Sequence, residues 1–373
     1  MQRLLRKIHK WVGLTVGILL FSQAGTGLAM VHKERLMALW APSVDASLPH
    51  RPLDGIMGAI HEAFPDGRLE RIVYYQDPSL PLVARVYPPD GRAFRIMLID
   101  PTVPEVISAG PFWHYPLQFV ERLHVALLSG NTGHVILFVE ALALVFMAVS
   151  GLFVWWPGRG RFRKAFRIRW RATPWRRMRD LHTVPGAATA VLMLVAGLTG
   201  AAIVADPITR SIVSIFAPVS AEAIPRLAEA PEPVAQVSWE AAFDQLERRF
   251  PDGRLRQLRF LGNNGRVLGA VMVAESSANP RAHDIALVDR WTGDLHVLAD
   301  GNELHGGDAF LAWILPLHTG EIYGPFRPVP MTLLGVSLAG MTLTGLLMWT
   351  KKRAPRRWRA RAAAGAAPER GSA

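Results

Sequence analysis

Four histidines recur in pairs along the chain, and their spacing is the first indication of chemistry. His9 is followed 173 residues later by His182, and His124 is followed 194 residues later by His318. The same two offsets relate a larger set of residues: Thr26-Gly27 with Thr199-Gly200, Gly130 with Gly324, Gly151-Leu152 with Gly345-Leu346, and Trp155 with Trp349. The hexapeptide Phe-Pro-Asp-Gly-Arg-Leu also occurs twice, at 64–69 and 250–255. The chain is therefore an internal duplication, and the paired histidines occupy equivalent places in its halves.

Paired histidines suggest a bound metal. Two neutral imidazoles on facing helices can bind a haem iron from both sides, within the interior of a helix bundle. The chain has no cysteine, which excludes disulfides, thiolate metal sites, iron–sulfur clusters and haem attached covalently through cysteine. A histidine at a membrane surface also commonly bonds a lipid headgroup or a helix end, and this remains the alternative for each ring.

Four apolar blocks carry or flank these histidines. Each is about twenty residues long, the length that crosses about 30 Å of hydrocarbon at about 1.5 Å per residue. About a hundred mixed residues separate the first block from the second and the third from the fourth, whereas only about 27 join the middle two. The first block is longer than a signal-peptide core and has a copy inside the chain, so we expect it to be retained.

The basic residues predict the orientation. The chain has a formal charge of +12, and its Lys and Arg residues gather at 3–10, 159–179 and 351–361. Because Lys and Arg accumulate on the cytoplasmic side, both termini and the central loop are expected in the cytoplasm. The basic excess is then a topology signal and a contact with the lipid bilayer, so we expect no nucleic-acid partner.

The two large loops each predict a small α+β domain. Helical spacing of apolar residues recurs at 53–64 and 239–250, before each Pro-Asp-Gly turn. Runs rich in β-branched and aromatic residues follow, at 69–75, 82–87, 93–100, 255–261, 267–273 and 284–289. The expected fold class is a mainly α membrane protein: a four-transmembrane-helix bundle with two extracytoplasmic α+β domains, internally duplicated.

Several short motifs resemble the PepSY-associated transmembrane family. They are Ile-His-Lys-Trp-Val-Gly at 8–13, Leu-His-x-x-Leu-Leu-x-Gly at 123–130, Ser-Gly-Leu-Phe-Val-Trp-Trp-Pro at 150–157, Asp-Leu-His at 180–182 and Leu-His-Thr-Gly at 317–320. On this resemblance the loop domains are PepSY-like, and the chain divides as follows: cytoplasmic 1–10, span 11–31, periplasmic domain 32–118, interfacial helix and turn 119–134, span 135–156, cytoplasmic loop 157–181, span 182–205, periplasmic domain 206–308, interfacial segment 309–328, span 329–349 and cytoplasmic tail 350–373.

The resemblance implies a function. Members of this family are multi-pass proteins of the bacterial inner membrane associated with iron uptake, and some are similar to di-haem b reductases of ferric siderophores in the periplasm. The chain lacks a Gly-x-Gly-x-x-Gly dinucleotide fingerprint. We therefore expect a separate electron donor, either a cytoplasmic protein or a quinol, and a membrane-bound ferric-siderophore reductase.

The expected cofactor is haem b, in two copies. We predict His9 and His182 as axial ligands on the inner side, and His124 and His318 on the outer side. From His124 to Trp155 is 31 residues, about 46 Å of continuous helix, so we expect the helix to break at 129–133.

Other residues are candidates of second rank. His32 and His134 could form the outer pair, although neither recurs in the other half. Glu140 is an ionisable residue inside the second span, which makes it a candidate for supporting a histidine, carrying protons or contacting a haem edge. Two competing functions remain: a haem-free membrane protein that binds or regulates partners in iron uptake, and a permease.

Overall fold

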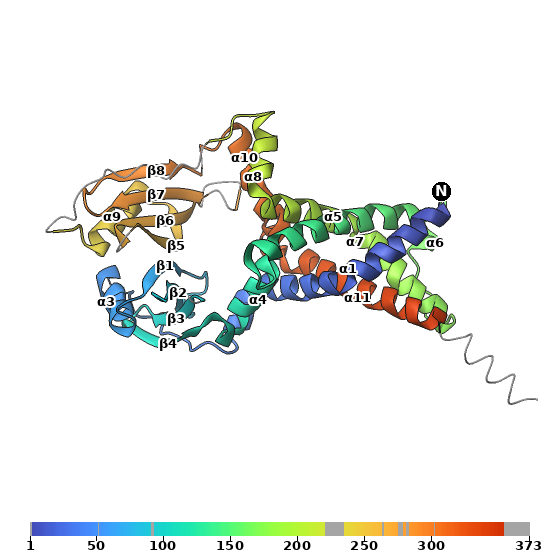
Figure 1. The fold of residues 1–373 in the computed structure, drawn as a ribbon, viewed down its shortest axis with the longest axis horizontal. Helices are drawn as coiled ribbons and strands as arrows, with labels where there is room; N and C mark the ends of the chain where they lie inside the picture. Colours follow the sequence, from blue (N-terminus) through green and yellow to red (C-terminus); the bar gives the residue numbers. More distant parts are fainter. Residues whose placement is uncertain are drawn as a thin grey trace, which may run out of the picture. The chain divides into compact units, whose positions relative to one another are not determined.

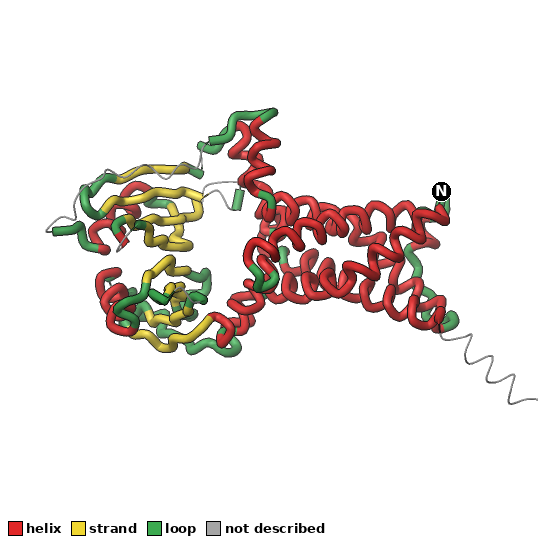
Figure 2. Tube along the Cα trace, viewed as in Figure 1, coloured by secondary structure: helices red, strands yellow, loops and turns green. Residues whose placement is uncertain are grey.

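The computed structural model describes residues 2–50, 52–90, 93–220, 235–262, 265–274, 279–280, 283–301 and 303–353. Most of the expected basic tail, residues 354–373, lies outside this range. The chain divides into two compact units (Figures 1 and 2). We call Met1–Leu28, Ser129–Val204 and Val329–Ala373 the helix unit, and Ala29–Leu128 with Ala205–Pro328 the sheet unit.

Four long apolar helices make up most of the helix unit (Figure 1). They are α1 (Gln2–Val31), α5 (Gly130–Trp155), α7 (Pro174–Val204) and α11 (Pro328–Arg353). All four are long and apolar enough to cross a membrane, which confirms the four predicted spans. Their shared core contains buried residues from each helix: Leu20, Ala24, Leu144, Ala148, Met193 and Leu338. A short helix, α6 (Phe162–Ala165), lies in the basic loop between α5 and α7.

Helices α5 and α7 approach closely at a glycine. A Cβ atom at Gly197 would lie 2.9 Å from the Val145 side chain and 3.1 Å from the Ala141 carbonyl oxygen. No larger residue fits there without movement, and small residues are what permit such close contact between membrane helices.

One antiparallel sheet of eight strands forms the centre of the sheet unit. In chain order the strands are β1 (Arg68–Val73), β2 (Leu82–Tyr87), β3 (Arg95–Asp100), β4 (Glu105–Pro111), β5 (Gly253–Leu261), β6 (Val267–Ala274), β7 (His283–Asp289) and β8 (Leu295–Ala299). Six of them match predicted runs, whereas β4 and β8 were not predicted. The strand order is β4-β3-β2-β1-β5-β6-β7-β8.

The two duplicated halves meet in the middle of this sheet. Strand β1 of the first half pairs with β5 of the second, with Ile72 opposite Leu258. Helices α3 (Leu53–Ala63) and α9 (Trp239–Arg249) contribute to a single hydrophobic core with residues from both halves of the sheet. The two predicted α+β domains thus share one sheet and one core. Pairing β1 with β5 is favourable because it removes one exposed sheet edge from each half.

Shorter helices complete the sheet unit. They are α2 (Lys33–Met37), η1 (Phe112–His114), α4 (Pro116–Ala126), α8 (Asp206–Ser214), α10 (Gly306–Thr319) and η3 (Glu321–Phe326).

Helix α4 ends where Leu127 and Leu128 adopt left-handed φ values of 46° and 58°. The helix break covers residues 127–129, so it overlaps the predicted stretch 129–133 only at Ser129, and α5 already begins at Gly130.

Candidate functional site

His124 and His318 lie close together in the sheet unit. Each lies in the last turn of its helix, α4 for His124 and α10 for His318. Both helices end in a left-handed residue, Leu127 after α4 and Gly320 after α10. The centroids of the two imidazole rings are 6.4 Å apart, and the ring planes are inclined by 48°. The structure thus brings together the two residues predicted as the outer pair.

This separation fits two imidazoles that bind one metal from opposite sides. Because each metal–nitrogen bond is about 2 Å long, the centroids of two such rings lie about 6 Å apart. Burial, followed by the neighbouring His318, lowers the pKa of His124 to about 4. His124 is therefore neutral near pH 7, which is the form that binds a metal.

In the helix unit, His9 is held by a neighbouring helix. Its Nδ1 atom lies 2.7 Å from the hydroxyl oxygen of Ser150 on α5. The same hydroxyl also lies 3.4 Å from the Met147 carbonyl oxygen. In the tautomer with its hydrogen on Nδ1, His9 donates to Ser150 and keeps its Nε2 lone pair available. A Cβ atom at Gly151 would lie 3.4 Å from His9 Cε1, so glycine there leaves room for the ring.

His182 is held in the equivalent way on the second half. Its Nδ1 atom lies 3.0 Å from the Met341 carbonyl oxygen and 3.1 Å from the Thr344 hydroxyl on α11. A carbonyl oxygen only accepts, so Nδ1 carries the hydrogen and Nε2 is again available. A Cβ atom at Gly345 would lie 3.5 Å from His182 Cε1. His182 is also near enough to His9 for the charges of the two rings to interact.

The two environments are built from corresponding residues. We call residues 147–151 and 341–345 the histidine contact segments. Their contacting residues correspond at the offset of 194, as Met147 with Met341, Ser150 with Thr344 and Gly151 with Gly345. Glycines on the opposite helices correspond too: a Cβ atom at Gly13 would lie 2.8 Å from the Met147 side chain, and one at Gly186 would lie 2.6 Å from that of Met341.

The sequence prediction missed Ser150 and Thr344. The available signal was their position, because each directly precedes an aligned glycine, Gly151 or Gly345. A metal-binding histidine usually donates its second ring N–H to a carbonyl, carboxylate or water, which fixes the tautomer. His182 meets this condition through a carbonyl oxygen, and His9 meets it through the Ser150 hydroxyl in the tautomer with its hydrogen on Nδ1.

The comparison with known families agrees with these motifs. The sequence profile described as PepSY-associated TM region matches residues 6–352. The chain belongs to this family. The matched range contains all four paired histidines and both histidine contact segments of this chain. None of the curated proteins matches the chain.

The secondary candidates of this PepSY-associated TM protein are His32, His134 and Glu140. His32 precedes α2 in the sheet unit, and His134 is exposed on α5 in the helix unit. Glu140 on α5 is only 3% exposed, and neither carboxylate oxygen has a hydrogen-bond partner among the described residues. The Nδ1 atoms of His9 and His182 bond the histidine contact segments, so Glu140 is not what orients them.

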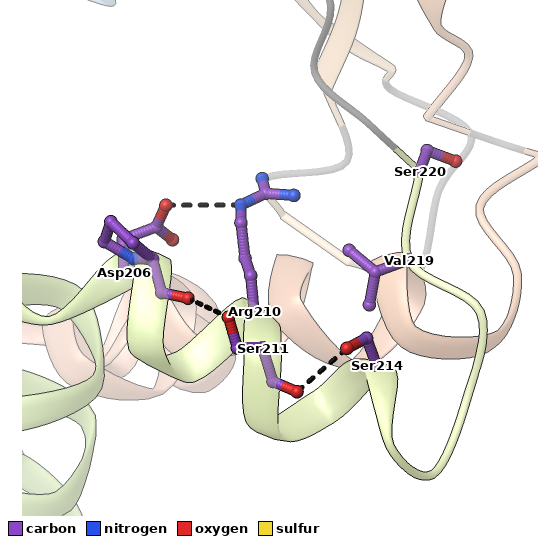
Figure 3. Close-up of a pocket in the computed structure, with 7 residues that line it drawn as sticks. Asp206, Arg210, Ser211, Ser214, Val219 and Ser220 are labelled. Atoms are coloured by element: carbon purple, nitrogen blue, oxygen red, sulfur yellow. Dashed lines mark hydrogen bonds and ion pairs between the residues drawn. The ribbon is translucent and has the colours of Figure 1, made fainter.

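Two further features bear on ligand binding. Among the described residues, no group of three or more His, Cys, Asp or Glu side chains could hold a metal ion; a haem needs only two axial ligands, because the porphyrin supplies the others. A hollow of about 380 Å³ lies along α8, where Arg210 pairs with Asp206 at 3.2 Å (Figure 3). No histidine lines it, so it offers no axial ligand.

Proposed function

We propose that this protein binds two haems b and passes electrons across the bacterial inner membrane to ferric siderophores in the periplasm. The observation that carries the proposal is the 6.4 Å separation of the His124 and His318 rings, which matches an axial ligand pair. The duplicated contacts of His9 and His182 support a second pair. The family match supports a membrane protein of the kind in which such reductases are expected.

The chain's own residues supply positioning and protonation states. Ser150 and the Met341 carbonyl hold Nδ1 of His9 and His182. His182 thereby presents Nε2 as a neutral ligand, and His9 does the same in the tautomer with its hydrogen on Nδ1. The lowered pKa of His124 keeps its ring neutral near pH 7. A haem bound to these residues would supply one-electron chemistry, with a potential set by its axial ligands and their hydrogen bonds.

The direction of electron flow follows from the proposed topology. Basic residues at 3–10 and 159–179 favour a cytoplasmic location for the N-terminus and the central loop. The sheet unit with His124 and His318 then belongs to the periplasmic side. An electron from a quinol or a cytoplasmic protein would reduce Fe(III) to Fe(II), and the less charged ion is held more weakly by the hard oxygen ligands of a siderophore.

The test is a dithionite-reduced minus oxidised visible spectrum of the purified protein, with haem quantified per chain. We expect b-type bands and about two haems per chain, as implied by two axial pairs. His182→Ala and His318→Ala should each remove about one haem, whereas His134→Ala should remove none. A haem-free protein from cells supplied with iron and haem precursor would overturn the proposal and favour the haem-free binding or regulatory function.

A further inference from the structure

Three arginines lie side by side across the middle of the sheet. In the strand register, Arg71 on β1 is directly opposite Arg85 on β2 and directly opposite Arg259 on β5. Ile72, beside Arg71 on β1, and Leu258, beside Arg259 on β5, belong to the hydrophobic core that also contains residues of α3 and α9. Because side chains alternate between the faces of a strand, the arginines lie on the face opposite that core. We call Arg71, Arg85 and Arg259 the arginine row.

Among the described residues, Glu70 forms long ion pairs with two members of the arginine row, and no acid forms a hydrogen bond to it. Like charges directly opposite in neighbouring strands destabilise a sheet. Glu70 is the acidic neighbour of two of them, but its carboxylate oxygens lie 3.6 Å from Arg85 and 4.0 Å from Arg71, beyond hydrogen-bond length. The Arg85 Nε atom is buried and has no hydrogen-bond partner among the described residues. Arg259 is exposed, so one end of the row is open to a ligand.

The arginine row is electrostatically linked to the end of α4 that carries His124. Glu121, three residues before His124, forms an ion pair with Lys33 at 2.8 Å. The charges of Arg85 and Arg71 also act on Glu121, and the charge of Glu121 acts on His124. The hydrogen bond described for this carboxylate comes from Lys33, and none joins it to Arg71 or Arg85 among the described residues.

We propose that the arginine row binds an oxygen-rich anionic metal chelate. Guanidinium groups suit this ligand, because each offers a planar set of N–H donors that bonds carboxylate-type oxygens in pairs. Arg259 is exposed and the Arg71 side chain is 24% exposed, so these two present such donors, while Arg85, 12% exposed, adds its charge beside them. The metal in the chelate rests on the function proposed above, whereas the binding of an oxyanion rests only on the register and charges of these residues.

The test uses the full-length protein in detergent and two redox-inert probes, gallium(III) citrate and gallium(III) tris-catecholate. Bound gallium is quantified after equilibrium dialysis. We expect at least one probe to bind, with affinity that falls as salt is raised. Arg259→Gln and Arg71→Gln should each weaken binding by about 10-fold or more, because each removes a charge-assisted hydrogen-bonding group. Arg248→Gln, an exposed arginine on α9, is the matched control and should bind like the unaltered protein.

Three results would overturn the proposal. They are no binding of either probe, equal binding by Arg259→Gln and Arg248→Gln, and displacement of gallium citrate by an equal concentration of inorganic phosphate. Because Arg259 is exposed, its substitution should leave the fold intact, and a thermal unfolding curve checks this. Haem is quantified in the same samples. Gallium binding by a haem-free protein would preserve this site and reject the proposed electron transfer, so the two failures are distinguishable.

Discussion

His182 Nδ1 lies 3.0 Å from the backbone carbonyl oxygen of Met341, whereas His9 Nδ1 lies 2.7 Å from the side-chain hydroxyl of Ser150. Equivalent histidines thus use different hydrogen-bond partners. The partner of His182 is a backbone carbonyl, which remains after any side-chain substitution. The partner of His9 is a side-chain hydroxyl, which a substitution can remove.

This difference predicts unequal effects of matched substitutions. Ser150→Ala removes the hydroxyl that is hydrogen-bonded to His9 and should weaken haem binding at this pair by about 10- to 100-fold, the usual cost of losing such a partner. Thr344→Val leaves the Met341 carbonyl in place and should have a much smaller effect. Haem per chain, measured during titration with haem, checks both variants. Equal losses in the two variants would reject the role assigned to Ser150.

Glycine at position 345 should be required by the His182 ring. In Gly345→Val the new Cβ would lie 3.5 Å from His182 Cε1 and 3.8 Å from Nδ1, and its methyl groups would then press on the ring. We expect the variant to lose about one haem per chain, read from the reduced minus oxidised spectrum. Gly340→Val on the same helix is the control, since nothing lies within 4 Å of a Cβ atom there. Both carry a similar helix-propensity cost, so equal haem contents would count against the contact.

Hydrophobic pattern predicted most of the fold. The four spans were readable because each is a long apolar run, and six strands because their residues are β-branched or aromatic. The two missed strands, β4 and β8, are the outermost in the sheet. Strand β4 ends in Ala-Gly-Pro, residues of low β-propensity, and β8 has only five residues. The pairing of β1 with β5 was not predictable, because alternation does not specify which strand a neighbour will be.

The candidate site, like the fold, was predictable only in part from the sequence. The duplication identified equivalent histidines, but the distance between His124 and His318 depends on contacts far apart in sequence. Ser150 and Thr344 gave no signal of their own, because a hydroxyl in an apolar helix commonly bonds a carbonyl one turn earlier. Thr344 does so here, donating to the Gly340 carbonyl oxygen at 2.7 Å.

The His124 ring should make stability depend on pH. Burial, with a smaller contribution from His318, lowers the pKa of His124 from 6.5 to about 4. As pH falls from about 6.5 to about 4, the unfolded chain takes up a proton that the folded chain does not. Stability should therefore be full above pH 6.5 and fall by up to about 3 kcal/mol as pH drops through this window.

Thermal unfolding of the haem-free protein between pH 4 and pH 7.5 measures this dependence. His124→Asn removes the titrating group and should flatten the curve in that window. His134→Asn, an exposed histidine on α5, is the control and should retain the slope. If His124→Asn keeps the full slope as well, the dependence belongs to other groups.

Glu140 should lower the stability of the helix unit. Its side chain is 3% exposed, and its carboxylate oxygens have no hydrogen-bond partner among the described residues. Burying a polar group without a partner costs about 1–3 kcal/mol. At the offset of 194 the second half has Leu334, which packs against the apolar core of the bundle. Glu140→Leu should therefore raise the unfolding temperature in detergent.

Glu140→Gln separates charge from polarity at this position. Glutamine cannot ionise but still requires hydrogen bonds, so its unfolding temperature should lie below that of Glu140→Leu. A lower unfolding temperature in both variants than in the unaltered protein would show that the carboxyl group makes a stabilising contact. A protein that retains a costly carboxyl group inside a span is expected to use it. Reduction potentials of the haem-loaded variants, measured at two pH values, would then test whether Glu140 exchanges a proton as the haem changes its charge.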